Sequence, residues 1–267
     1  MKFLLKTFPL LLTPLLLFAE APAPLRILCI GDSITHGGHR GRAEYTYRLP
    51  LARTLHEQGI PFEMHGTQTE GLHPGFNWPD LADGVPFPAR HEGYYAYTTD
   101  QLRHLMRENL PKIPPPDVAL IHLGTNDQRS RDYQRSIIAP LEEIIARLRE
   151  RNPNVIVLVG HLNFNEGPAL RIRPLKTEMA RKLNRPDSPV LTVPHYQGWI
   201  ANPQASNPHT YDWLHPNPAG QEKMAHAWLQ ELDRAMEMQA DAFEPEEDRA
   251  KRLRTFLELR QNAQTEE

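Results

Sequence analysis

A serine, a histidine and an aspartate occur in sequence settings that suit nucleophilic catalysis. Ser33 follows Gly31, Asp32 and the mostly apolar residues 25–30, so a buried strand would deliver it to a tight turn. Such a turn exposes the hydroxyl and leaves backbone N–H groups free beside it. Gly-Asp-Ser is also common in ordinary turns. The interpretation therefore depends on three later segments, residues 93–102, 124–127 and 212–215.

The candidate general base for Ser33 is His215, because a serine hydroxyl reacts only when a base accepts its proton. Asp212 lies three residues before His215. On a turn that enters a helix, this spacing lets the carboxylate hold one imidazole nitrogen and leaves the other for the serine. The alternative is structural: Asp212 would cap the last helix, and His215 would be a polar loop residue.

Apolar runs that alternate with helical patterns predict an α/β fold. The expected strands are residues 25–30, 61–66, 117–123, 155–160 and 190–193, and the expected helices are residues 44–58, 98–109, 132–151, 169–183 and 216 or 218 to 238. Strands separated by helices favour parallel pairing, and near-continuous apolar strands favour a sheet covered on both faces. We therefore predict a three-layer α/β/α sandwich around a parallel sheet of about five strands. Ligands bind at the carboxyl ends of such strands, where Ser33 and Asn126 fall.

Four segments resemble the GDSL, or SGNH, hydrolase family, and they follow one another along the chain in the family's order. Residues 31–35 read Gly-Asp-Ser-Ile-Thr, residues 124–127 read Gly-Thr-Asn-Asp, and residues 212–215 read Asp-Trp-Leu-His. Residues 91–102 are similar to the second block of the family's carbohydrate acetylesterase branch, where the pattern runs close to His-Glu-Gly-Tyr-Ser-Gly-Trp-Thr-Ile-Asp-Gln. The resemblance covers residues 25–230. It implies a flavodoxin-like SGNH hydrolase fold and ester cleavage without a cofactor.

The resemblance also implies an oxyanion hole with three donors: the Ser33 backbone N–H, the N–H of the second-block glycine and the Asn126 side-chain amide. In this chain the glycine position holds Ala96. A backbone N–H survives that change, but a positive φ at Ala96 would cost of order 1 kcal/mol. Ala96 is the candidate donor, with Gly93 and Gly66 as alternatives, and Asn126 has the alternative of being an ordinary turn residue.

Three side chains are candidates for binding the substrate, namely Asp32, Tyr95 and Trp213. Asp32 precedes the nucleophile, and we expect it to support the turn rather than to react. The rings of Tyr95 and Trp213 suit a wall against a sugar ring, although packing in the core or in loops explains them about as well. His36 and His39 lie just past Ser33, and we expect them to be exposed loop residues rather than pocket residues.

Composition narrows the classes of function. The chain has 13 His but no His-Glu-x-x-His motif and no Cys/His cluster, so we predict neither a metal nor a cofactor. A formal net charge of −3 gives no indication of a nucleic-acid partner. Cys29 is the single cysteine, which excludes an internal disulfide, and we expect it to be a core residue.

Residues 1–21 resemble a secretory signal peptide. Lys2 and Lys6 precede a Leu-rich run, and Ala19-Glu20-Ala21 has the small-x-small pattern of a cleavage site. The run is short and contains Pro9 and Pro14, which argues against a spanning helix. We predict a secreted or periplasmic protein without stable membrane insertion; an uncleaved anchor is the alternative.

The remaining chain is predicted to form a hydrolase domain over residues 22–240 and a charged helical tail over residues 241–267 that packs back or mediates dimer contact. Its oligomeric state is open. A long loop over residues 67–92 is expected to act as a lid or wall.

The sequence predicts a secreted serine esterase that removes small acyl groups, acetyl above all, from carbohydrate, so that its partner is an acylated carbohydrate or another small ester. The acetyl preference rests on the resemblance. A lysophospholipase or thioesterase of the same family is the first alternative, but the loop over residues 67–92 lacks the long aliphatic run of an acyl groove. A non-catalytic carbohydrate-binding protein is the second, and the intact set of candidate catalytic residues argues against it.

Overall fold

The computed structural model describes residues 23–38, 44–73 and 77–244. The predicted signal peptide over residues 1–21 lies outside the described residues, as does the predicted tail from residue 245 onward. Among the described residues, no helix has both the length and the apolar character that crossing a membrane requires.

Helices alternate with strands along the chain, as predicted. The strands are β1 (Leu25–Gly31), β2 (Phe62–His65), β3 (Glu92–Gly93), β4 (Val118–His122), β5 (Ile156–Gly160) and β6 (Val190–Val193). The helices are α1 (Ser33–His36), α2 (Arg48–Glu57), α3 (Thr99–Asn109), η1 (Leu110–Lys112), η2 (Gln134–Ile138), α4 (Ala139–Arg151), α5 (Pro168–Leu183) and α6 (Pro218–Phe243).

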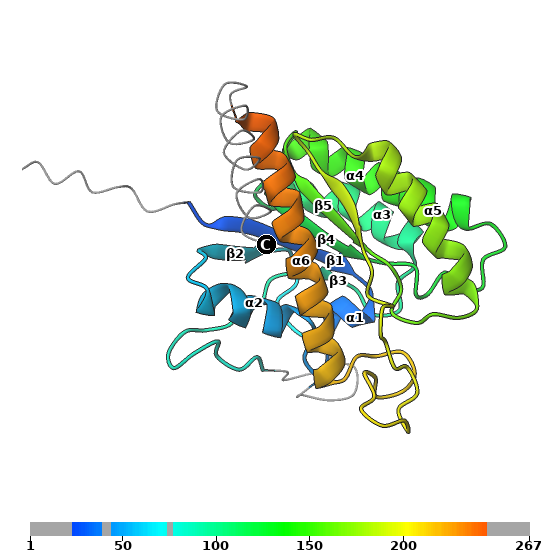
Figure 1. Ribbon diagram of the computed structural model, residues 1–267. Helices are drawn as coiled ribbons and strands as arrows, with labels where there is room; N and C mark the ends of the chain where they lie inside the picture. The colour runs from blue at the N-terminus through cyan, green and yellow to red at the C-terminus, as the bar shows by residue number, and fades with distance from the viewer. Residues whose placement is uncertain (1–22, 39–43, 74–76, 245–267) are drawn as a thin grey trace, which may run out of the picture.

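All strand pairs are parallel, in the order β2-β1-β4-β5-β6, and the two-residue β3 pairs with the end of β1. Helices α2 and α6 cover one face, while α3, α4 and α5 cover the other (Figure 1). The three-layer α/β/α sandwich with a parallel sheet of about five strands is therefore confirmed. Strand β3 was not predicted, because two residues are too short to show an alternating pattern.

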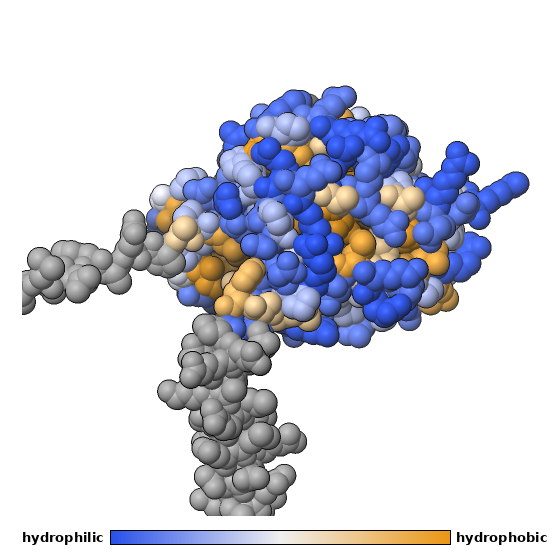
Figure 2. Space-filling model, turned by 90° about the horizontal axis from the view of Figure 1, so that it is seen from above, coloured by the Kyte–Doolittle hydropathy of each residue, from blue (hydrophilic) through white to orange (hydrophobic). Residues whose placement is uncertain are grey.

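Both faces of the sheet are buried, as the apolar strands predicted. In β1, Leu28 and Ile30 pack into the core under α3, α4 and α5, whereas Ile27 and Cys29 pack into the core under α2 and α6. Cys29 is fully buried, which confirms it as a core residue. On the face drawn in Figure 2, hydrophilic residues predominate and hydrophobic ones form separate patches, as expected when apolar side chains lie between layers.

Prolines explain two differences from the expected helices. Helix α2 begins at Arg48 rather than at residue 44, which places Pro50 in the first turn, where a missing N–H needs no intrahelical acceptor. The predicted helix over residues 132–151 opens with the π-turn η2, directly before Pro140 of α4. Pro140 cannot donate to the carbonyl four residues earlier, and the wider π-turn accommodates this lost hydrogen bond.

The described part of the predicted loop over residues 67–92 packs against α2 through the fully buried Arg48. The Arg48 guanidinium lies 4.5 Å from the centre of the Trp78 ring, and the Trp78 and Phe87 rings are 4.3 Å apart. Arg48 Nη1 also donates to the Ala89 carbonyl at 2.9 Å. This segment is thus a packed wall against the first turn of α2.

A buried amine lies at the carboxyl edge of the sheet. Lys176 of α5 is fully buried, and its Nζ donates to the carbonyls of Leu123 and Gly160 at 2.7 Å each. Burial lowers the pKa of Lys176 to about 8, while the charges of Asp32 and Asp127 act in the opposite direction. Because these carbonyls lie at the ends of β4 and β5, the amine fixes the positions of two neighbouring strand ends.

Replacing Lys176 with Met is expected to lower the free energy of unfolding by roughly 2–4 kcal/mol, because two buried carbonyls lose their donor and two acidic groups lose a nearby cation. Urea denaturation measures this loss. Lys182→Met, at a side chain that is 63% exposed on the same helix, is the matched control and is expected to change little. Equal stability of the two variants would show that the buried amine does not hold the strand ends.

Candidate active site

Ser33 is the first residue of α1 and follows β1 through a turn in which Gly31 and Asp32 each have a structural role. A Cβ at Gly31 would lie 2.1 Å from Thr35 Oγ1 and 2.8 Å from the His122 carbonyl oxygen, so only glycine fits. Asp32 Oδ1 accepts a hydrogen bond from the Ile34 N–H at 3.0 Å and caps the helix. The predicted delivery of a serine by a buried strand is therefore what the structure shows.

The Asp32 side chain is completely buried. Burial raises its pKa to about 6, although the hydrogen bond from the Ile34 N–H acts in the opposite direction. A carboxylate without solvent exposure has no surface for a substrate. This placement supports the expected role in the turn and speaks against Asp32 as a substrate-binding residue.

Three side chains form a continuous hydrogen-bonded chain. Ser33 Oγ lies 3.0 Å from His215 Nε2, although the two residues are 182 positions apart. His215 Nδ1 lies 2.9 Å from Asp212 Oδ2 and 3.2 Å from Oδ1. The hydroxyl is thus within reach of a base whose other nitrogen is held by a carboxylate, which is the geometry that activates a serine.

Asp212 is an orienting residue for His215 and not a helix cap. Its Oδ1 accepts from the His215 N–H at 2.8 Å, while Asn217 caps α6 through the Gly220 N–H. Burial alone would raise the pKa of Asp212, but the hydrogen bonds from the His215 backbone and imidazole lower it to about 2. The carboxylate is therefore ionised near neutral pH and can stabilise an imidazolium.

The backbone N–H groups of Ser33 and Ala96 have no acceptor within the described part of the chain. Ala96 is exposed and has φ 62°, the left-handed conformation that the exchange of glycine for alanine put in question. The Gly93 alternative is excluded as a free donor, because its N–H donates to His91 Nδ1 at 2.9 Å.

The candidate amide donor Asn126 is joined to the loop that carries Ala96. Asn126 Nδ2 donates to the Tyr97 carbonyl at 2.9 Å, which leaves its second amide hydrogen for another acceptor. The neighbouring Asp127 Oδ2 accepts from the N–H and the hydroxyl of Thr99 at 3.0 and 2.8 Å. Sequence reasoning did not assign Asp127; its place at the end of the Gly-Thr-Asn-Asp segment was the available signal.

Trp213 and Leu214, which lie between Asp212 and His215 in the sequence, line a pocket. The pocket has a volume of about 400 Å³ and is lined by residues that lie on three segments, Gln128, Phe164, Glu166, Gly167, Pro168, Trp213 and Leu214. Trp213 is 55% exposed and has φ 71°. An exposed aromatic ring on a strained backbone between two catalytic candidates suggests a functional role. Tyr95 is half-buried and does not line this pocket.

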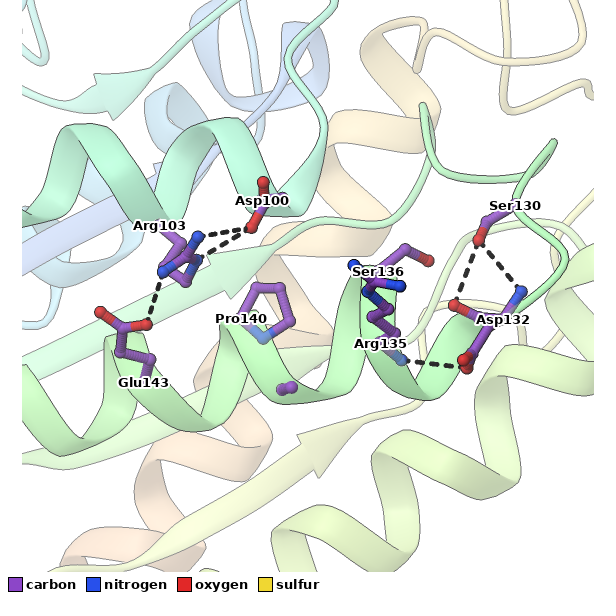
Figure 3. A pocket seen from close by; sticks show the side chains of 9 residues that line it. Asp100, Arg103, Ser130, Asp132, Arg135, Ser136, Pro140 and Glu143 are labelled. Carbon is purple, nitrogen blue, oxygen red and sulfur yellow. Dashed lines mark hydrogen bonds and ion pairs between the residues drawn. The ribbon is translucent and has the colours of Figure 1, made fainter.

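A larger pocket of about 530 Å³ lies between α3 and the start of α4, and none of the candidate catalytic residues lines it. Figure 3 shows that Arg103 binds Asp100 and Glu143, and that Asp132 accepts from the backbone N–H of Arg135. We assign ester cleavage to the Ser33 region because Ser33, His215 and Asp212 are hydrogen-bonded to one another there. Across the described residues, no group of three or more His, Cys, Asp or Glu side chains is placed to hold a metal ion.

His36 was expected to be an exposed loop residue, and that expectation is wrong. His36 is the last residue of α1 and is partly buried, with its Nδ1 accepting the Tyr95 N–H at 3.1 Å. No local pattern in the sequence shows this contact, because Tyr95 lies 59 positions away. His39 lies outside the described residues.

Replacing Ala96 with Gly is expected to keep esterase activity, since the backbone N–H remains, and to raise the stability by about 0.5–1 kcal/mol as the left-handed strain is relieved. Replacing Ala96 with the β-branched Val is expected to lower stability by at least about 1 kcal/mol. Thermal unfolding of both variants, with kcat measured in parallel, checks this order. A more stable Val variant would contradict the strained conformation.

Comparison with known proteins places this geometry in a family. Residues 29–223 match the GDSL-like Lipase/Acylhydrolase family. A carbohydrate esterase family 3 protein from Talaromyces cellulolyticus shares 18% identity at a TM-score of 0.64, over 80% of this chain and 98% of that chain. A family 3 carbohydrate esterase of Clostridium thermocellum shares 21% identity at a TM-score of 0.61, over 81% and 99%.

A third similar structure is an acetyl esterase with an acetate ion, at 18% identity and a TM-score of 0.65, over 80% of this chain and 98% of that chain. These likenesses show a shared fold. A comparison with curated protein sequences gave no match. Because the family match covers most of the chain, the conclusion concerns the family: this chain belongs to the GDSL-like lipase/acylhydrolases and is a carboxylic ester hydrolase of the SGNH type.

Proposed function

We propose that this protein is a secreted or periplasmic serine esterase that removes acetyl groups from carbohydrate. The observation that carries the proposal is the hydrogen-bonded chain from Ser33 through His215 to Asp212, together with the backbone N–H groups of Ser33 and Ala96, which have no acceptor among the residues that the structure describes. The N-terminal pattern of residues 1–21 supports the compartment.

In the proposed mechanism, Ser33 Oγ attacks the ester carbonyl while His215 Nε2 takes the hydroxyl proton. The ionised Asp212 stabilises the imidazolium that results. The N–H groups of Ser33 and Ala96 and the amide of Asn126 donate to the oxyanion. His215 then protonates the departing alcohol, and the acyl group stays on Ser33. A water molecule, deprotonated by His215, attacks the acyl-enzyme and releases acetate.

Two features support a carbohydrate alcohol over a lipid. The pocket lined by Trp213 and Leu214 combines the aromatic Trp213 and Phe164 with the polar Gln128 and Glu166, which suits a ring with an apolar face and hydroxyl edges. The second-block segment resembles the carbohydrate acetylesterase branch, and similar structures carry the names carbohydrate esterase family 3 and acetyl esterase.

Replacing Ser33 with Ala is expected to abolish hydrolysis of p-nitrophenyl acetate by the purified protein, because no nucleophile remains. Fluorophosphonate is expected to label the wild-type protein and not this variant. Undiminished hydrolysis by the variant would reject the assignment. A wild-type protein that fluorophosphonate does not label would favour a non-catalytic carbohydrate-binding protein.

In a chain-length series of p-nitrophenyl esters we expect an optimum at acetate. An optimum at eight or more carbons would favour the lysophospholipase or thioesterase alternative.

Replacing Trp213 with Ala is expected to lower kcat/KM for an acetylated oligosaccharide about tenfold, the loss of one stacking contact, while kcat/KM for ethyl acetate stays within about twofold. Alanine keeps a Cβ, so the strain of the positive φ is matched between the two proteins. Acetate release, measured for both substrates, checks the split. An equal loss on both substrates would show that Trp213 shapes the triad and does not bind the sugar.

A further inference from the structure

The loop that carries Ala96 is anchored at the far end of the helix that carries the nucleophile. Helix α1 has 4 residues, with Ser33 at its first position and His36 at its last. The His36 N–H donates to the Asp32 carbonyl at 2.9 Å, so the histidine is fixed to the turn that holds the serine. His36 Nδ1 in turn accepts the Tyr95 N–H at 3.1 Å, across 59 positions of sequence.

Each of the three backbone N–H groups directly before Ala96 donates a hydrogen bond. Gly93 donates to His91 Nδ1 at 2.9 Å, Tyr94 donates to the Gly31 carbonyl at 2.9 Å, and Tyr95 donates to His36. Within the described residues, Ala96 has the first N–H in this series that lacks an acceptor. The series thus ends where the resemblance expects an oxyanion donor.

The close approach of this loop to α1 requires a glycine. A Cβ at Gly93 would lie 2.6 Å from the His36 backbone nitrogen and 2.8 Å from its Cα, distances that are too short for any other residue. On the far side of Ala96, the Tyr97 carbonyl accepts from Asn126 at 2.9 Å. Ala96 is therefore flanked by two anchors, one from His36 and one from Asn126.

Each anchor from a histidine needs an uncharged ring, because a protonated Nδ1 carries a hydrogen and cannot accept. Burial, and then the charge of Arg48, lower the pKa of His36 to about 4. Arg48 of α2 faces His36, with Nη2 3.4 Å from the His36 carbonyl. The other titratable neighbour is His91, whose ring lies 5.4 Å away and whose pKa is well below its usual value through burial. Both rings are thus neutral near pH 7.

We propose that His36 is a positioning residue for ester hydrolysis, which holds the Tyr95 N–H so that the adjacent Ala96 N–H faces the oxyanion formed on Ser33. This inference rests on the proposed function, in which Ala96 is an oxyanion donor. Helix α1 then sets the distance between nucleophile and donor, because Ser33 is its first residue and its last residue, His36, binds the loop next to Ala96. Ala96, in a strained conformation, is held there by its neighbours.

The test compares two replacements of similar size. In His36→Asn the side-chain oxygen takes the place of Nδ1 and still accepts, whereas His36→Leu has no acceptor. For p-nitrophenyl acetate we expect His36→Leu to lower kcat at least about tenfold, approaching the 10²–10³-fold loss of a whole donor, with KM within about twofold. We expect His36→Asn to stay within about threefold of the wild-type kcat.

A boronic acid that forms a tetrahedral adduct with Ser33 provides a second readout. Its inhibition constant is expected to rise in His36→Leu by the same factor by which kcat/KM falls, because both report binding of the oxyanion. His104→Leu, at a side chain that is 56% exposed on α3, is the matched control and is expected to leave both values unchanged.

Wild-type kcat and inhibitor affinity in His36→Leu would overturn the inference, as would an Asn variant that loses as much kcat as the Leu variant. If His36→Leu does not fold, His36→Gln replaces it, since its oxygen takes the place of Nε2 and we expect the same loss of kcat. A fully active Gln variant would also overturn the inference. Failure of the proposed function has a different signature, namely a wild-type protein that hydrolyses no short ester and is not labelled by fluorophosphonate.

Discussion

The turn from β1 into α1 is the constraint on which the rest of the site depends. Gly31 lets the chain bend against Thr35, Asp32 caps the new helix, and Ser33 begins it within 3.0 Å of His215. The Gly31 carbonyl accepts the Tyr94 N–H, so the same turn also holds the loop with the candidate oxyanion donor. A change in its backbone would therefore shift the nucleophile and that loop together.

Charged groups without solvent contact surround this turn. Arg48 is fully buried and donates to the Thr35 carbonyl at 3.0 Å, while Lys176, also fully buried, holds two strand ends. Both bind backbone carbonyls, and these hydrogen bonds offset the cost of burying the cations. The two cations thus fix carbonyls around the turn and at the ends of the strands, which is the requirement of a preorganised site.

The sequence predicted those parts that short-range patterns determine. Alternating apolar runs predicted the parallel sheet, and the three-residue spacing of Asp212 and His215 predicted their hydrogen bond. The role of His36 depends on a contact with Tyr95, 59 positions away, so no local pattern reveals it. The left-handed φ of Ala96 was an open question for the same reason, because the loop's own sequence does not determine which conformation its anchors impose.

The anchors also explain how alanine can stand where the related pattern has glycine. A left-handed alanine costs roughly 1–2 kcal/mol, and a typical hydrogen bond contributes about 1 kcal/mol net. The bonds from Tyr95 to His36 and from Asn126 to Tyr97 flank Ala96 and together offset a cost of that size. A glycine would adopt the same φ without strain but would lose more conformational freedom on folding. The chain therefore holds the oxyanion donor in place by its neighbours' contacts, and the residue type at the donor itself matters less than those two bonds.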